Sequence, residues 1–435
     1  MTLLQPSQDL PYISLPERFA FAPGPFLAQM YDQHGPIFRA HLFGREVIYM
    51  VGPEANRFIL STHRQYFSHH EGWGKLTGAV QLLGDGLITM DGSQHDQHRQ
   101  MMHPAFTLTF MEHYLPIMQR HIHTYINRWL ERGEVDIHTE MRKIAFAILA
   151  ETLAGLSTGS EVVLFQELFT SLLNLGRGGT PEQGILGRSG QVKQALYELL
   201  QPKIQARREY PTDDILGILV QARTDDGQML TDEQLIAHIN FLVGTGHETT
   251  SSLGAWALYL LARHPAYLGR VIDEQAQIVP AGKDMTLDDL KRMTALDLAL
   301  SEAERLYPPL DMGPRGVVTA FEFHGYQIPV GSFVCYAIAA THLISSIFAN
   351  PLVFDPDRFL PPREEHKKTA YALVGFGGGP RICIATNYVN VALKALLSTI
   401  LGTYRLEVLS NQEPVQFYRG IGMPLRGLRL HIARL

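Results

Sequence analysis

Apolar residues recur at three- and four-residue intervals along much of the chain, which is the period of a helix with one buried face. Met118, Ile122 and Ile126 show this spacing within a helical region of about residues 90–310. A second helical region covers about residues 384–402. The pattern therefore predicts a mainly α-helical protein.

Two other regions, about residues 35–60 and 314–340, carry the shorter alternation and the turn residues of β-strands. The segment Ile37–Val51 predicts a hairpin, because Gly44 can adopt the positive φ that a tight turn needs. Short alternating runs on both sides of Gly325 predict a second hairpin. Small β-sheets are therefore expected beside the helices.

One predicted helix is unusually long. Thr231 and Gln234 form a capping-box pattern before it and Pro265 ends it, so that it spans Asp232–Arg263. Its middle, Gly244–Ser251, contains two glycines and several hydroxyl residues, which weaken a helix. The weakness indicates either a functional distortion or a place where another helix packs closely. The helix pattern alone does not separate these two explanations.

The composition favours one large domain over residues 1–435, since no repeat, low-complexity linker or change of composition divides the chain. Of its 435 residues, 46% are apolar and 18% are charged, which excludes a disordered chain or a fibre. The net charge of −6 argues against a nucleic-acid partner. The sequence shows neither a transmembrane anchor nor a signal peptide, so we expect a soluble, cytoplasmic monomer.

The chain has two cysteines, Cys335 and Cys383, which are too few for a disulfide framework or a four-thiolate zinc site. Cys335 lies in an apolar run and is expected to be a small core residue. Cys383 follows a glycine-rich segment and precedes a helical pattern. The helix N-terminus and the charge of Arg381 favour a thiolate there, and a thiolate held in this way can ligate iron.

The segment Phe376–Ala385 resembles the haem-binding signature of the cytochrome P450 family. Four residues match the signature, and Ala385 replaces its last glycine: Phe376, Gly379, Arg381 and Cys383. The resemblance implies a single-domain P450 fold, a triangular prism that is mainly α with small β-sheets. It implies haem b between the long central helix and the helix after the cysteine loop, with Cys383 as the axial iron ligand.

Glu302 and Arg305 are three residues apart in a predicted helix and, on spacing alone, would form a surface ion pair. The family resemblance identifies them as its Glu-x-x-Arg motif and adds Arg358 as the third member. The implied role is a buried charge network that fixes the cysteine loop, so these residues are structural rather than catalytic.

The centre of the long helix provides the candidate catalytic pair, Glu248 and Thr249. Its sequence resembles the Ala-Gly-x-Glu-Thr-Thr of the family, whose acid and alcohol deliver protons to iron-bound dioxygen. Thr245 replaces the usual alanine and could add a second hydroxyl or bend the helix. A zinc-protease motif is excluded, because Ser251 stands where its second histidine would be.

Cationic residues are expected around the two haem propionates. His95 and Arg99 share one predicted helix face, and the family places a Trp or His and then an Arg at these positions. The implied cofactor-binding set is His95, Arg99, Gly246, Arg315, Phe376 and Arg381. Four other histidines are expected to be ordinary surface residues: His69, His70, His98 and His103.

The resemblance implies a haem-thiolate monooxygenase, an oxidoreductase that inserts one atom of O2 into an apolar small molecule such as a lipid or terpenoid. We expect electrons from NAD(P)H to arrive through a separate ferredoxin or flavodoxin and its reductase. Lys367, Lys368 and Lys394 are candidate docking residues. Two alternatives are a peroxide-driven oxygenase, which often lacks the acid–alcohol pair, and a haem sensor or carrier without turnover.

By analogy with the family, the substrate pocket is apolar and is lined by residues from several segments: Trp73, Phe241, Thr245, Leu310, Met312 and Ile421. Asp311 is a polar exception. It is either an anchor for a hydroxyl or cation of the substrate or a solvated loop carboxylate.

Overall fold

The computed structural model describes residues 10–21, 23–42, 44–129, 131–157, 159–177, 185–280, 283–409, 414–419, 421–424 and 427–435. The α-helices in these ranges are α1 (Pro23–His34), α2 (Pro53–Arg57), α3 (Ala79–Leu83), α4 (Gly92–Met102), α5 (Leu108–Ile126), α6 (Ile137–Ala154), α7 (Ser160–Arg177), α8 (Ile185–Glu209), α9 (Ile215–Gln221), α10 (Asp232–Arg263), α11 (Pro265–Ile278), α12 (Leu287–Arg292), α13 (Thr294–Leu306), α14 (Ile338–Thr341), α15 (Glu365–Lys368) and α16 (Thr386–Leu401). Short 3-10 or π-helical turns lie at Phe19–Phe21, Phe58–Thr62, Arg64–Tyr66, His70–Leu76, His103–Phe106, Pro356–Phe359 and Gly379–Arg381. The strands are β1 (Ile37–Leu42), β2 (Arg45–Met50), β3 (Phe67–Ser68), β4 (Glu134–Asp136), β5 (Met312–Val317), β6 (Phe321–Phe323), β7 (Tyr326–Ile328), β8 (Phe333–Ala337), β9 (Tyr404–Val408), β10 (Gln416–Arg419), β11 (Ile421–Pro424) and β12 (Arg429–Arg434).

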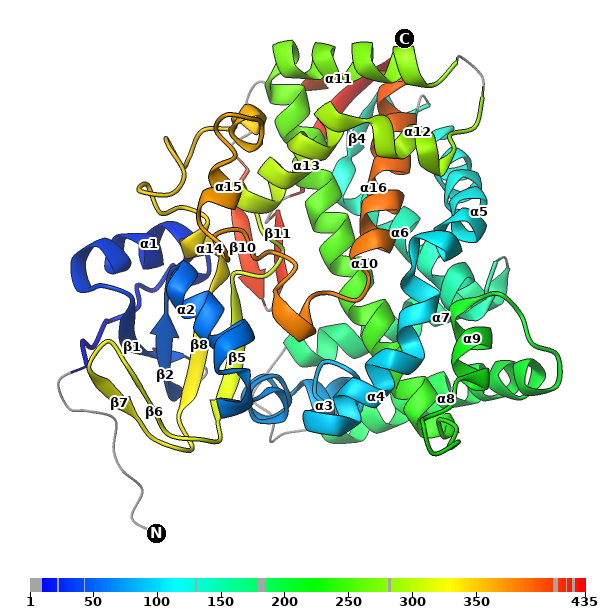
Figure 1. Ribbon diagram of the computed structural model, residues 1–435. Coiled ribbons are helices and arrows are strands. Elements are labelled where there is room, and N and C mark those ends of the chain that lie inside the picture. Colours follow the sequence, from blue (N-terminus) through cyan, green and yellow to red (C-terminus); the bar gives the residue numbers. More distant parts are fainter. Residues whose placement is uncertain are drawn as a thin grey trace.

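The largest sheet has the strand order β1-β2-β8-β5-β3 and lies at one side of a mainly helical body (Figure 1). Its first two strands form the hairpin that the sequence predicted, with Ile37 opposite Met50 and Gly44 at a φ of 72°. The strands β6 and β7 form the second predicted hairpin. Residues 53–62, most of which the prediction placed in the β-rich region, are instead helical. The mainly α class with small sheets is confirmed.

The long helix α10 passes through the middle of the molecule (Figure 1). It starts and ends at the predicted residues, and the capping box of Thr231 and Gln234 is formed. Its glycine-rich centre is α-helical throughout, so the helix is not broken there. The hydroxyls of Thr245, Thr249 and Ser251 each bond to the carbonyl four residues earlier. These bonds satisfy the hydroxyls without breaking the helix.

The helices α6, α13 and α16 make the most extensive helix contacts with α10, and α3, α8, α9 and α11 also touch it. Where α6 passes its centre, the methyl groups of Leu149 lie 3.5 Å from the place where a Cβ on Gly246 would be. This is an ordinary van der Waals distance, so the packing of α6 does not require a glycine at position 246. Among the described helices, none combines the length and the apolar character needed to cross a bilayer.

Candidate active site

One face of α10 is left partly open in the middle of the molecule. Between residues 235 and 262, every residue of this helix is buried except Leu242, Thr245, Gly246 and Thr249. Their spacing of three and four residues places them in one stripe along the helix. Three of the four belong to the motif that the sequence analysis singled out, so the motif faces an open space rather than the core.

Cys383 lies in the turn that leads into α16, and its N–H donates to the carbonyl oxygen of Phe376 at 2.8 Å. Gly379 adopts a φ of 60°, and a Cβ there would lie 2.2 Å from the carbonyl oxygen of Leu60, so this turn requires glycine. Burial raises the pKa of the Cys383 thiol above its ordinary value.

Three groups act in the opposite direction on that pKa: hydrogen bonds from the Ala385 N–H and the Thr386 hydroxyl, and the charge of Arg99. The positive charge that lowers the pKa of Cys383 is therefore that of Arg99, whereas the sequence analysis expected Arg381 to favour the thiolate. The sequence analysis did not identify Thr386, although a hydroxyl three residues after a cysteine at a helix start is a recognisable signal.

Arg315 on β5 and Arg381 in the cysteine loop gather on the same side of the site. Burial and then the charges of these two arginines hold the pKa of His69 well below its ordinary value, so both lie beside one ring. Arg315 is 3% exposed and lies with its guanidinium 5.2 Å from the ring centre of Tyr336. It also donates to the carbonyl oxygen of Pro314 at 2.8 Å.

The buried Nη1 of Arg381 has no hydrogen-bond partner among the described residues, and the nearest acid, Asp91, is 3.5 Å from its Nη2. Buried cationic donors of this kind require an anion. The two carboxylates of a haem, placed beside a cysteine thiol, meet that requirement, so the residues present fit haem.

His95 on α4 is buried, and its Nδ1 lies 2.9 Å from Oδ1 of Asp96. Burial lowers the pKa of His95 to about 4, so the ring is neutral at pH 7. A neutral imidazole can donate one hydrogen bond to a haem propionate. Arg99, one turn later on α4, is half-buried.

The two members of the candidate catalytic pair have different hydrogen-bond partners. Glu248 is 1% exposed and accepts from Nη2 of Arg142 on α6 at 2.7 Å. The Thr249 hydroxyl donates to the carbonyl oxygen of Thr245 at 2.5 Å. The sequence analysis did not identify Arg142, because it lies 106 residues before its partner.

The predicted charge network is formed and completely buried. Arg305 binds both carboxylate oxygens of Glu302, at 2.7 and 2.8 Å, and Arg358 donates to the same carboxylate at 3.1 Å. All three side chains are 0% exposed. Arg358 also binds Glu365, at 2.6 Å, a fourth member that the sequence analysis did not identify.

The residues predicted for the substrate pocket come from several elements: Trp73 in the turn His70–Leu76, Phe241 and Thr245 on α10, Leu310 in the loop before β5, Met312 at the start of β5, and Ile421 on β11. The loop before β5 is tied to the hairpin of β10 and β11, since the Gly422 N–H donates to the carbonyl oxygen of Pro309 at 2.7 Å. Leu310 and Met312 pack against two different apolar clusters.

Asp311 is 7% exposed, so it is not a solvated loop carboxylate. Burial raises its pKa to about 7, although its own N–H and that of Met312 bond to the carboxylate. Burial, then Cys335 and then Asp311 raise the pKa of Tyr49 on β2, so Asp311 lies close to this residue. The hydroxyl of Tyr49 has no hydrogen-bond partner among the described residues.

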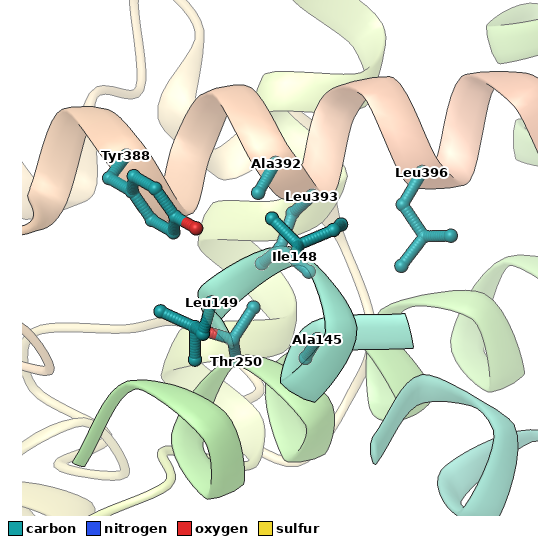
Figure 2. A pocket seen from close by; sticks show the side chains of 8 residues that line it. All are labelled: Ala145, Ile148, Leu149, Thr250, Tyr388, Ala392, Leu393 and Leu396. Atoms are coloured by element: carbon teal, nitrogen blue, oxygen red, sulfur yellow. The ribbon is translucent and has the colours of Figure 1, made fainter. Parts of the chain in front are cut away.

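A small cavity of about 20 Å³ lies between α6, α10 and α16 (Figure 2). It is lined by Ala145, Ile148, Leu149, Thr250, Tyr388, Ala392, Leu393 and Leu396. This volume is enough for one or two water-sized molecules, and the lining is almost wholly apolar. No predicted pocket residue lines it, so this cavity is distinct from the predicted substrate pocket.

Three expectations about surface residues were wrong. His69 is not an ordinary surface residue, because its ring lies beside Arg315 and Arg381 and its pKa is lowered by burial. Lys394 is 7% exposed, donates to the carbonyl oxygen of Leu290 and pairs with Asp297 at 2.7 Å, so it cannot meet a partner protein. His98 is also buried, with its Nδ1 2.8 Å from Nε2 of His238. Cys335 is 0% exposed, as predicted for a core residue.

The sequence profile of the cytochrome P450 family matches residues 20–178 and 183–431. The chain is 31% identical to cytochrome P450 120 of Synechocystis sp. over 393 residues, 89% of this chain and 87% of the relative. It is 29% identical to mouse cytochrome P450 26B1 over 407 residues, 89% of this chain and 78% of the relative. Among solved structures, retinoic acid-bound cyanobacterial CYP120A1 matches with a TM-score of 0.86 and 29% identity, with 100% of both chains covered.

A half-buried cysteine before a helix, cationic donors beside it and a buried Glu–Arg–Arg network fit a haem-thiolate site in a mainly helical fold. The chain belongs to the cytochrome P450 family. Members of this family are monooxygenases, so the protein is an oxidoreductase whose cofactor is haem.

Proposed function

We propose that this protein inserts one atom of O2 into an apolar small molecule, with electrons from NAD(P)H delivered by a separate ferredoxin or flavodoxin. The observation that carries the proposal is the open stripe on α10. It presents the hydroxyls of Thr245 and Thr249 beside Gly246 and contains no charged residue. Such a surface suits a small apolar reactant that needs protons from nearby donors.

Haem bound at Cys383 supplies the iron at which dioxygen is reduced. The chain supplies protons and keeps the site apolar. The Thr249 hydroxyl must leave the carbonyl oxygen of Thr245 to offer its proton to the open stripe. Glu248, the adjacent residue on α10, is the acid placed to replace that proton. Arg142, which is 33% exposed, holds its carboxylate from the solvent side of the protein.

For the substrate we propose an apolar lipid or isoprenoid, and retinoic acid is the first compound to test. The support is the match to a structure described as retinoic acid-bound, at 29% identity over the whole chain. Trp73, Leu310 and Ile421, which we propose as lining residues, would give such a molecule an apolar surface. A titration of the ferric Soret band with retinoic acid, retinol and a saturated fatty acid would rank these classes.

For the redox partner we propose docking on the exposed lysines of α15. Lys367 pairs with Glu364 at 2.6 Å, which leaves Lys368 as the better candidate. Lys368→Glu should slow reduction by ferredoxin about tenfold at low salt, and the difference should shrink as salt screens the charge. Lys291→Glu, an exposed lysine on α12, is the matched control. Equal effects of the two variants would contradict the docking site.

The decisive test is the absorption spectrum of the dithionite-reduced, carbon monoxide-bound protein, for the wild type and Cys383→Ser. A strongly red-shifted Soret band that the variant loses is expected for a haem thiolate at Cys383. A folded, haem-supplemented protein without a haem band would contradict the proposal. A band at the shorter wavelength typical of histidine ligation would place a different ligand on the iron.

Thr249→Ala separates the oxygen-driven reaction from the peroxide-driven alternative. With electrons from a surrogate ferredoxin, we expect the variant to consume NADPH but to form at least tenfold less product per electron pair, since a proton donor is lost. Unchanged coupling would favour the peroxide route. Absence of NADPH consumption in the wild type with each member of a substrate panel would favour a sensor or carrier.

A further inference from the structure

Glu304 on α13 is buried beside the cysteine loop, although it lies between the residues of the Glu–Arg network and is not part of it. Its side chain is 9% exposed. The backbone N–H groups of Gly375 and Phe376 donate to its carboxylate. A Cβ on Gly375 would lie 2.3 Å from Oε1 of Glu304, so the loop needs glycine here to admit the carboxylate.

A single residue of the cysteine loop, Phe376, connects this carboxylate with the proposed axial ligand. The N–H of Phe376 donates to Glu304, and its carbonyl oxygen accepts the N–H of Cys383 at 2.8 Å. Burial and, in addition, the negative charge of Glu304 raise the pKa of the Cys383 thiol. The carboxylate therefore acts on the ligand both through the loop backbone and through its charge.

We infer that Glu304 is a positioning residue that fixes the cysteine loop and, by its negative charge behind Cys383, lowers the reduction potential of the bound haem. The inference rests on the proposed function only in requiring haem at Cys383. Reduction adds one electron, and thus one negative charge, at the iron. A buried carboxylate nearby makes that addition less favourable, because few water molecules screen it.

The same residue couples reduction to proton uptake. Burial raises the pKa of Glu304 to about 7, so near neutral pH the carboxylate gains a proton from solvent when an external reductant such as dithionite supplies the electron. The charged and titratable groups around Glu304 do not change their protonation near neutral pH. Arg305 is held by Glu302, and Nε2 of His342 accepts the N–H of Val374, which requires a neutral ring.

The test is a spectroelectrochemical titration of the holoprotein at pH 6 and pH 8, for the wild type and Glu304→Gln. The wild-type midpoint potential should fall between these pH values, whereas that of Glu304→Gln should stay nearly constant and lie above the wild type at pH 8. The potentials of the two proteins should converge at pH 6, where the wild-type carboxyl is protonated. Parallel pH profiles, or equal potentials at pH 8, would overturn the inference.

A second variant keeps the test decisive if Glu304→Gln fails to fold. Gly375→Ala leaves the charge in the protein but pushes the carboxylate away from the Phe376 N–H, so the fall in potential between pH 6 and pH 8 should become smaller. Glu140→Gln removes a buried carboxylate that is held by Trp129 and should leave the fall in potential between pH 6 and pH 8 unchanged. A normal red-shifted carbon monoxide band with a pH-independent potential would refute this inference alone, whereas loss of that band would refute the proposed function.

Discussion

Arg142 on α6 donates from Nη2 to Oε1 of Glu248 on α10 at 2.7 Å, so a residue outside the long helix holds the acid of the candidate catalytic pair. Glu248 is 1% exposed, whereas Arg142 is 33% exposed. The adjacent His247 also binds α6, since its Nε2 lies 3.1 Å from the carbonyl oxygen of Arg142. A positive charge beside a buried carboxylate favours its ionised form.

Arg142→Gln should raise the pKa of Glu248, because the opposite charge is lost. We expect the alkaline limb of the pH–activity profile to move to higher pH. The amount of product formed per NADPH should fall several-fold. The free energy of unfolding should fall by about 1–3 kcal/mol, the cost of removing the partner of a buried charged group. Lys143→Gln, which removes the next cation on α6, is the control. An unchanged pH profile with unchanged coupling would contradict the role of Arg142.

Arg358→Met should destabilise the protein strongly, because Glu302 and Arg358 are both 0% exposed and the charge left behind stays buried. Loss of one member of a buried ion pair costs about 3–5 kcal/mol. Urea unfolding followed by circular dichroism measures this cost. Arg363→Gln removes an arginine that is 38% exposed and should cost about 1 kcal/mol or less. Similar costs for the two variants would contradict the structural role of the buried network.

Local patterns made much of the fold predictable. The capping box of Thr231 and the proline after Arg263 fixed both ends of α10, because each signal lies within a few residues of the boundary that it sets. The hairpin at Gly44 was predictable for the same reason. The short motif around Cys383, whose spacing is specific, predicts the haem ligand.

Pairings between distant residues were not predictable in this way. Glu248 finds Arg142 on another helix, and Glu304 meets a loop about seventy residues later. Periodicity shows which face of a helix is buried but not which residue lies opposite. Lys394 illustrates the difficulty, since its charge suggested the surface while its neighbours on α16 are apolar and buried.

The buried pair of His98 and His238 should make the protein sensitive to acid. Burial lowers the pKa of His238 to about 3, whereas an unfolded histidine has a pKa of about 6.5. Between these values the unfolded chain binds more protons, so stability is complete above pH 6.5 and is lost as the pH falls below it. His238→Gln should reduce the loss between pH 7.5 and pH 5.5 by about 1.4 kcal/mol.

Urea unfolding at the two pH values measures this difference, and the exposed His113, changed to Gln, is the matched control. Because a glutamine amide can still donate to His98, the variant tests the protonation rather than the hydrogen bond. Equal pH dependence in the wild type and His238→Gln would contradict this prediction.

Asp311 should have the opposite dependence on pH. Burial raises its pKa to about 7 from an ordinary value of 3.8, so between these values the folded state binds more protons than the unfolded state. Its contribution to stability is therefore present below pH 3.8 and is lost as the pH rises to about 7. Asp311→Asn should abolish this loss and be more stable than the wild type at pH 8 by about 1–4 kcal/mol.

The same variant tests whether Asp311 contacts the substrate. If the carboxyl binds a hydroxyl or cation of the substrate, Asp311→Asn should weaken the substrate-induced Soret shift of such a compound about tenfold and leave that of a hydrocarbon unchanged. Asp357→Asn, at an aspartate that is 50% exposed and paired with Arg270, controls for the loss of a carboxylate. A stabilised variant with unchanged binding would make Asp311 a buried acid of the β5 loop, and unchanged stability at pH 8 would contradict its raised pKa.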